Sequence, residues 1–143
     1  MHYNIFMKTN ILVDQTESLS DYFRYLGQPV RLKILLILLG GEACVCHMEA
    51  ILGLRQAIIS QHIMLLRKKG IIVSRRDGRH IYYQLKNISL MDGVLQAANV
   101  LNISIPLIDV YTRQAIPECP CPRCNPGLEP ALICKKPVIK IES

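Results

Sequence analysis

The residues of this 143-residue chain best suited to chemistry are its six cysteines, which fall into two groups and one outlier. Cys44 and Cys46 flank a single valine near the middle of the chain, and Cys119, Cys121 and Cys124 lie close together near its end. In a reducing compartment, closely spaced cysteines favour metal binding or redox chemistry over structural disulfides, and thiolates prefer soft or borderline ions. The spacing therefore predicts a thiol site for a soft ion, or a thiol redox sensor.

The bulk composition limits the class of protein. Half of the residues are hydrophobic and 20% are charged, so a packed core is expected. The longest apolar run, Ile34–Leu39, is far too short to cross a bilayer, and no secretory signal is evident over Met1–Leu12. We expect a cytoplasmic protein with no membrane contact. No pairing of nucleophile with base and no phosphate-binding loop appears, so an enzyme is not expected.

Positive charge is concentrated in the middle of the chain. The formal net charge is +6, and residues 55–86 hold eight Lys or Arg residues against one acid, Asp77. A basic segment on an otherwise nearly neutral chain is typical of phosphate contact. A merely solvated face is the plain alternative, but the elements expected in this segment favour nucleic acid.

Hydrophobic periodicity predicts a mainly α-helical chain with one β-hairpin. Helices are expected over residues 16–26, 29–39, 46–52, 56–69 and 90–102, and strands over 71–76 and 79–85. Asp77 and Gly78, between the two strands, form a strong two-residue turn signal. A helix, a glycine-containing turn and a second helix, followed by a basic hairpin, is the pattern of a winged helix-turn-helix.

Three segments organise the chain. Residues 1–14 show no strong periodicity and are predicted to be a flexible N-terminal arm, and residues 15–116 are predicted to be one DNA-binding and dimerisation domain. Residues 117–143 form a Cys- and Pro-rich tail, whose composition argues against regular structure. The first and last helices carry more apolar residues than a small core needs, so we expect the chain to dimerise through them.

Four sequence pieces resemble the ArsR/SmtB family of metal-sensing winged helix-turn-helix repressors. They are Leu26–Leu35, Cys44–Cys46, Leu54–Leu66 and Arg75–Tyr83, in the family's order and spacing. The resemblance covers roughly residues 18–91. It implies a homodimer that binds a pseudo-palindromic operator in double-stranded DNA and is released when an inducer binds.

The helix expected over residues 56–69 would enter the major groove by its N-terminal half. Gln56, Ser60 and Gln61 are predicted base contacts, because a glutamine can pair bidentately with adenine. His62 is predicted to contact a base or a phosphate, although Ser60 and His62 could instead be capping or solvated residues. Basic side chains of this helix and of the wing are predicted to hold the DNA backbone: Arg67, Arg75, Arg76 and Arg79. Arg67, Lys68 and Lys69 could instead be only solvent-facing.

Cys44 and Cys46 lie at the predicted start of the short helix before the reading helix. Residues two apart on a regular helix point to different sides, so the pair can share one ion only at the frayed first turn. There the helix dipole also favours thiolate over thiol. A bound ion would therefore strain the helix that supports the reading helix. The plain alternative is a pair of inert buried cysteines.

The ligand set of the predicted site is one thiolate short. Arsenic sensors of the family usually carry a third cysteine at the position of Glu49. The resemblance therefore leaves the third ligand to His47, to a partner chain, or to the tail through Cys119, Cys121 or Cys124. The tail cysteines, together with Cys134, could instead build a separate structural zinc site. A second metal site of the family uses Asp and His on the last helix, which here has Asp92 and no histidine.

Arsenite is the predicted inducer, because three thiolates suit a trigonal soft ion. Cadmium, antimonite, lead and zinc are the other ions that such a site would take. The alternative function is a thiol-redox-sensing repressor of the same fold, in which Cys44 or Cys46 pairs oxidatively with a tail cysteine.

Overall fold

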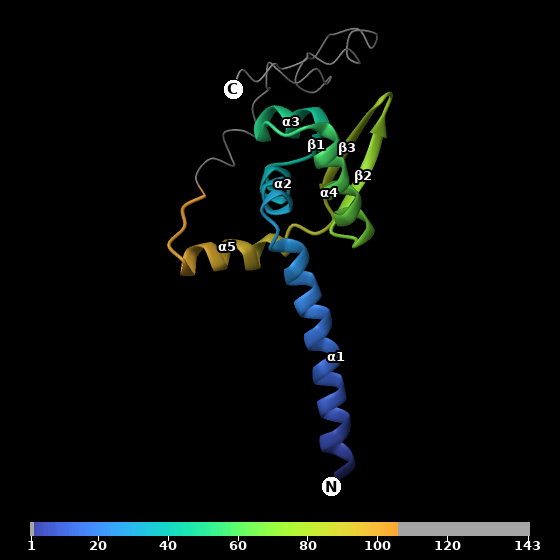
Figure 1. Cartoon of the computed structure of the whole chain (residues 1–143), viewed down its shortest axis with the longest axis vertical. Helices are drawn as coiled ribbons and strands as arrows, with labels where there is room; N and C mark the ends of the chain where they lie inside the picture. Colours follow the sequence, from blue (N-terminus) through green and yellow to red (C-terminus); the bar gives the residue numbers. More distant parts are fainter. Residues whose placement is uncertain (1, 106–143) are drawn as a thin grey trace.

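The computed structural model describes the backbone of residues 2–105 and the side chains of residues 14–105. Five helices and three strands follow one another in this part of the chain (Figure 1): α1 (His2–Leu26), α2 (Pro29–Leu39), β1 (Ala43–Cys44), α3 (Val45–Leu52), α4 (Gln56–Lys68), β2 (Ile72–Asp77), β3 (His80–Leu85) and α5 (Leu90–Val100). The mainly helical winged helix-turn-helix predicted from the sequence is confirmed. The predicted tail, residues 117–143, lies outside the described residues.

The first helix corrects one expectation. Its predicted start near Thr16 is wrong, because α1 begins at His2 and includes most of the segment predicted to be a loose arm. The reason is visible in the burial of its side chains: residues 14–20 are all exposed, and α1 projects from the body of the molecule (Figure 1). An exposed stretch of helix needs no apolar stripe, so its sequence lacks the periodic signal that predicts a helix.

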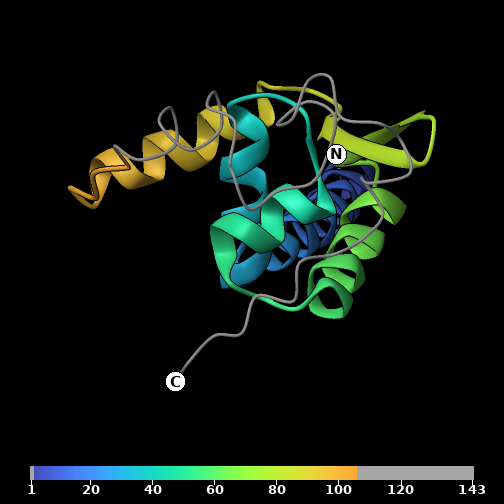
Figure 2. The same ribbon diagram turned by 90° about the horizontal axis from the view of Figure 1, so that it is seen from above.

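The core is built around α2, which contacts α1, α3, α4, α5 and β3. Its residues Ile34, Leu35, Ile37 and Leu38 are buried, as expected of a helix that is apolar all round. Pro29 occupies its first turn, and the side chain of Gln28 accepts a hydrogen bond from the Arg31 backbone N–H at 2.9 Å, which caps the helix. Helices α1, α3, α4 and α5 surround α2 (Figure 2).

The wing is part of a three-stranded antiparallel sheet with strand order β1-β3-β2. Cys44 of β1 lies opposite Tyr82 of β3, which in turn lies opposite Arg75 of β2, so these three side chains share one face. Ala43 and Tyr83 share the other face and contact the core. The sequence did not predict β1, because a two-residue strand is too short to show alternation.

Among the described residues, no helix combines the length and the apolar character needed to span a membrane.

Two neighbouring residues of α4 test this packing. Ile63 is 2% exposed and Met64 is 68% exposed. Ile63→Ala should lower the free energy of unfolding by about 2–5 kcal/mol, since it leaves a cavity in the core. Met64→Ala should change it by less than about 0.5 kcal/mol. Urea denaturation of the two variants measures both values, and equal losses would contradict the orientation of α4.

Candidate DNA-binding surface and thiol site

Helix α4 is held to the body by one face and presents the opposite face to solvent. Ile59, Ile63 and Leu66 are buried in the core. The opposite stripe consists of four exposed residues at spacings of four, three and four: Ala57, Gln61, Met64 and Lys68. We call these four residues the exposed stripe of α4. Between α3 and α4 the chain turns at Gly53, whose φ of 64° favours glycine.

Two of the five predicted DNA-contacting residues of α4 are exposed, and the other three are half-buried. Gln61 lies within the exposed stripe, and Arg67 is exposed on its flank. Gln56 and Ser60 are half-buried along the same flank as Arg67. These positions are compatible with base contacts by short polar side chains, which stay predictions.

His62 lies on the other flank of α4 and does not belong to this surface. It is half-buried, and its Nδ1 atom is enclosed without a hydrogen-bond partner in the described part of the chain. Burial lowers the pKa of His62 below its ordinary value, and the positive charge of Arg31 lowers it further. This surrounding is compatible with a packing role, and the contact of His62 with DNA stays a prediction.

The three arginines of the wing differ in their surroundings. The Arg75 guanidinium donates to both carboxylate oxygens of Glu42, with Nε 2.6 Å from Oε2, and lies 4.7 Å from the centre of the Tyr82 ring. Arg76 and Arg79 are exposed, and no carboxylate pairs with either within residues 14–105. A phosphate would therefore meet two unneutralised wing cations and one that is already neutralised.

The thiol pair lies at the first turn of α3, as predicted. Cys44 is the N-cap residue, and its Sγ accepts a hydrogen bond from the His47 backbone N–H at 3.4 Å. Cys44 is 3% exposed and Cys46 is half-buried. His47 is buried beside them, and Glu49, at the position of the family's third cysteine, is half-buried further along α3.

No group of three or more His, Cys, Asp or Glu side chains that could hold a metal ion occurs among the described residues. The predicted tail ligands Cys119, Cys121 and Cys124 lie outside the described residues, so the full ligand set stays a prediction. Cys44 and Cys46 are the part of it that the structure places.

The thiol pair is connected to the wing, and local sequence does not predict this connection. Cys44 belongs to β1, whose pairing with β3 places it opposite Tyr82. Two residues earlier, Glu42 binds Arg75 of β2. Both ends of this short segment are thus fixed to the hairpin that is expected to hold DNA. Local sequence carries no signal for this register, because its partners are some forty residues apart along the chain.

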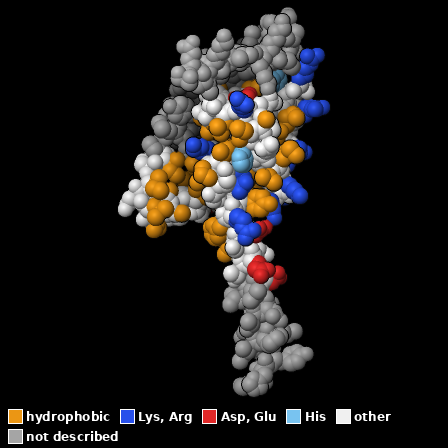
Figure 3. Space-filling view, viewed as in Figure 1, with side chains coloured by type: hydrophobic (Ala, Val, Ile, Leu, Met, Phe, Trp, Pro, Cys, Tyr) orange, Lys and Arg blue, Asp and Glu red, His pale blue; other side chains and the backbone are white. Residues whose placement is uncertain are grey.

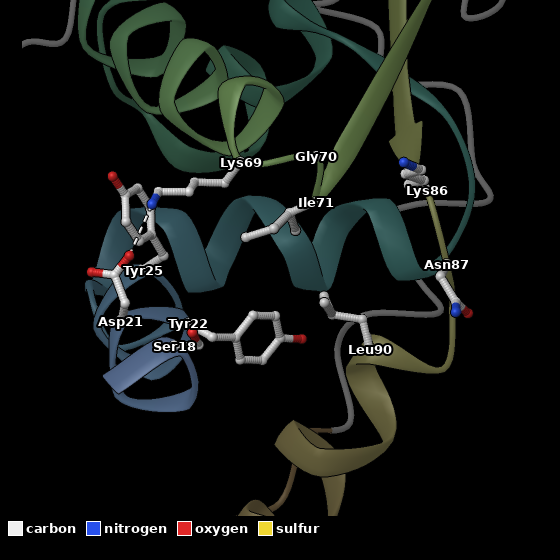
Figure 4. Close-up of a pocket in the computed structure, with 10 residues that line it drawn as sticks. All are labelled: Ser18, Asp21, Tyr22, Tyr25, Lys69, Gly70, Ile71, Lys86, Asn87 and Leu90. Carbon is white, nitrogen blue, oxygen red and sulfur yellow. Dashed lines mark hydrogen bonds and ion pairs between the residues drawn. The ribbon is translucent and has the colours of Figure 1, made fainter. Parts of the chain in front are cut away.

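A pocket of about 630 Å³ lies where α1, the end of α4 and the start of α5 meet (Figure 4), and it is lined by Ser18, Asp21, Tyr22, Tyr25, Lys69, Gly70, Ile71, Lys86, Asn87 and Leu90. The Lys69 ammonium binds Asp21 at 2.8 Å and lies 4.6 Å from the centre of the Tyr25 ring. The hydrogen bond from Lys69 lowers the pKa of Asp21. These contacts tie α1 to the end of α4.

Basic and apolar side chains occupy different parts of the surface. Lys and Arg gather along the side where α4 and the wing lie, and apolar side chains gather over α5 (Figure 3). The large exposed apolar residues of α1, α5 and the segment after it are Leu19, Phe23, Leu95, Val100, Leu101 and Ile103. Exposed apolar groups of this extent mark interaction surfaces.

Comparison with known proteins agrees with this arrangement. Residues 28–74 match the family described as "Bacterial regulatory protein, arsR family". The chain is 35% identical over 86 residues to the cadmium resistance transcriptional regulatory protein CadC of Listeria innocua, spanning 59% of this chain and 72% of that protein. It is 32% identical over 88 residues to the arsenical resistance operon repressor of Staphylococcus aureus, spanning 62% of this chain and 84% of that protein. The chain belongs to the ArsR/SmtB family.

Solved structures show the same fold. The transcriptional repressor BigR from Xylella fastidiosa superposes with a TM-score of 0.56 at 26% identity, covering 66% of this chain and 93% of that one. As a member of the ArsR/SmtB family, the protein is a DNA-binding transcriptional regulator and not an enzyme.

The wing arginines give a salt-dependence test. Each phosphate contact contributes about 0.9 to the slope of log binding constant against log salt concentration. Arg76→Ala should reduce the magnitude of that slope by about one unit on a nonspecific duplex. Arg75→Ala should reduce it much less, because Glu42 already neutralises Arg75. Equal reductions for the two variants would mean that the ion pair with Glu42 opens on DNA.

The lowered pKa of His62 gives a pH test. Its folded-state pKa lies below the unfolded value, so the unfolded chain takes up a proton first as pH falls. Stability is therefore unaffected by His62 well above the unfolded pKa of about 6.5, and it decreases as pH falls below that value. Urea denaturation at pH 7.5 and 5.5 should show a larger loss for the wild type than for His62→Gln. Identical losses would show that His62 is accessible to protons in the folded state.

Proposed function

We propose that the protein is a homodimeric repressor that leaves its operator when a soft ion binds through Cys44 and Cys46, with arsenite as the most suitable ion. The observation that carries the proposal is the double role of Cys44, which is both the N-cap residue of α3 and a residue of the strand that pairs with the wing. The names of two relatives, a cadmium resistance regulator and an arsenical resistance repressor, support a soft ion.

The first consequence of ion binding falls on the start of α3. The Cys44 sulfur accepts the hydrogen bond that caps this helix. A sulfur bonded to an ion must turn toward it and toward Cys46, and the cap is weakened or lost. Removing a helix cap costs about 1 kcal/mol, which is enough to move the first turn of α3. Helix α3 contacts α4, so the reading helix feels the change.

The second consequence falls on the wing. Cys44 is buried and paired with β3, so its displacement pulls on the backbone opposite Tyr82. The ion pair between Glu42 and Arg75 ties the same segment to β2. The ion would thus bind more tightly to a displaced arrangement of α4 and the wing than to the DNA-binding arrangement. Such a difference in affinity is what a switch requires. Coupling of about 1–3 kcal/mol would change operator affinity by roughly 5–150-fold.

The remaining ligand comes from outside the thiol pair. His47 is buried beside the pair and is one candidate. The tail cysteines Cys119, Cys121 and Cys124 are the candidates that would complete a three-thiolate site for arsenite. Cadmium, antimonite, lead and zinc are the ions that a site with a different third or fourth ligand would select.

The dimer is proposed to form through α1 and α5. Their exposed apolar side chains, among them Leu19, Phe23 and Val100, would be covered by a second copy. Two copies of α4 would then reach half-sites about one turn apart, roughly 34–36 Å.

Removal of either sulfur should separate DNA binding from induction. Cys44→Ser keeps a good N-cap oxygen, and Cys46→Ser changes little volume, so both should bind operator about as tightly as the wild type. Neither should be released by arsenite at concentrations that release the wild type. Anisotropy titration of the operator complex with arsenite, antimonite, cadmium, lead and zinc measures this directly.

A parallel titration with hydrogen peroxide separates the redox alternative. If peroxide releases the protein from DNA, a thiol reductant reverses the release, and no ion has an effect, the signal is a disulfide and not an ion. Release of Cys46→Ser by arsenite would contradict the assigned site.

A further inference from the structure

The exposed stripe of α4 contains a large apolar residue that the fold does not use. Met64 is 68% exposed, more than Ile58 and Leu65, which are each 39% exposed on the same helix. Its position opposite the buried residues Ile59 and Ile63 keeps it out of the core. An exposed, flexible thioether in the middle of a helix is available for contact with a partner.

The charges around Met64 identify that partner as DNA. Lys68 follows one turn later in the same stripe, and Arg67 is exposed beside it. The wing adds the unneutralised cations Arg76 and Arg79, and the basic side of the molecule lies over α4 and the wing (Figure 3). A protein partner of so basic a surface would have to present carboxylates around an apolar contact. A DNA duplex offers phosphates at the rim of the groove and base edges at its centre.

The major groove offers one apolar group on its base edges, the C5-methyl of thymine. Gln61 precedes Met64 by three residues, so the two side chains are neighbours on the helix surface. We propose that Met64 is a specificity-determining residue that contacts a thymine methyl beside the base read by Gln61. The proposal rests on DNA binding by α4, and it is independent of the ion that Cys44 and Cys46 bind.

The length of the side chain supports this assignment over its neighbours in the stripe. Met64 is the ninth residue of α4, one turn beyond Gln61, and a helix that enters the major groove by its N-terminal half would bring this turn less deeply into the groove. The methionine side chain has three rotatable bonds and can span the extra distance to a base. Ala57, near the N-terminal end of α4, lies where a short methyl group would be long enough.

The experiment replaces thymine by deoxyuracil, which removes only the methyl group. A duplex of about 30 base pairs is first selected from a randomised pool by the wild-type full-length protein. Each thymine of one half-site is then replaced in turn, and affinity is measured by anisotropy. One position should weaken wild-type binding about fourfold, the value of one buried methyl group. Met64→Ala should lose sensitivity at that position alone, and Met64→Leu should keep it.

Lys68→Ala is the matched control from the same stripe. It should weaken all duplexes equally and leave the deoxyuracil profile unchanged, as expected for a phosphate contact. An unchanged profile for Met64→Ala would overturn the proposal, as would a change in its sedimentation coefficient, which would place Met64 in a contact between protein copies. If the wild type selects no duplex at all, the proposed DNA-binding function is contradicted. If the wild type selects a duplex but Met64→Ala leaves the deoxyuracil profile unchanged, only the role of Met64 is contradicted.

Discussion

The pairing of two residues, Ala43 and Cys44, with the wing strand β3 is the constraint on which the account depends. It makes Cys44 a member of the sheet as well as the cap of α3. A change at this one sulfur would therefore affect both α3 and the wing. The ion pair between Glu42 and Arg75 reinforces the connection on the same segment. Without this strand, a ligand at the thiol pair would act on α3 alone.

The rest of the fold holds α4 by its buried face and leaves the opposite face exposed. Helix α2 supplies an apolar centre, and three buried residues of α4 fix the rotation of that helix about its axis. This rotation determines which side chains α4 presents to solvent: Gln61 and Met64 point outward, and His62 is half-buried on one flank. In the proposed mode of binding, electrostatic attraction from the basic wing and helix would give affinity, and the stripe would give sequence preference.

Local sequence patterns were enough to predict α2, α4, α5 and the hairpin, because each has a clear apolar period or turn signal. They also placed Cys44 and Cys46 at the start of a helix. They failed where information is not local. The start of α1 was missed, because the sequence before residue 16 shows no strong period. Strand β1 is two residues long, and the partnership of Glu42 with Arg75 depends on a register set by the whole sheet. The half-buried position of His62 also depends on tertiary packing, and its contact with DNA stays a prediction.

The central claim is that an ion at Cys44 and Cys46 is felt in the wing through β1. Amide hydrogen exchange of the DNA-free protein, with and without one equivalent of arsenite, tests it most directly. We expect altered exchange at residues 43–44 together with residues 82–83 of β3, and unchanged exchange in the middle of α5. Loss of operator affinity on addition of arsenite, with no change in the exchange of β3, would contradict the claim.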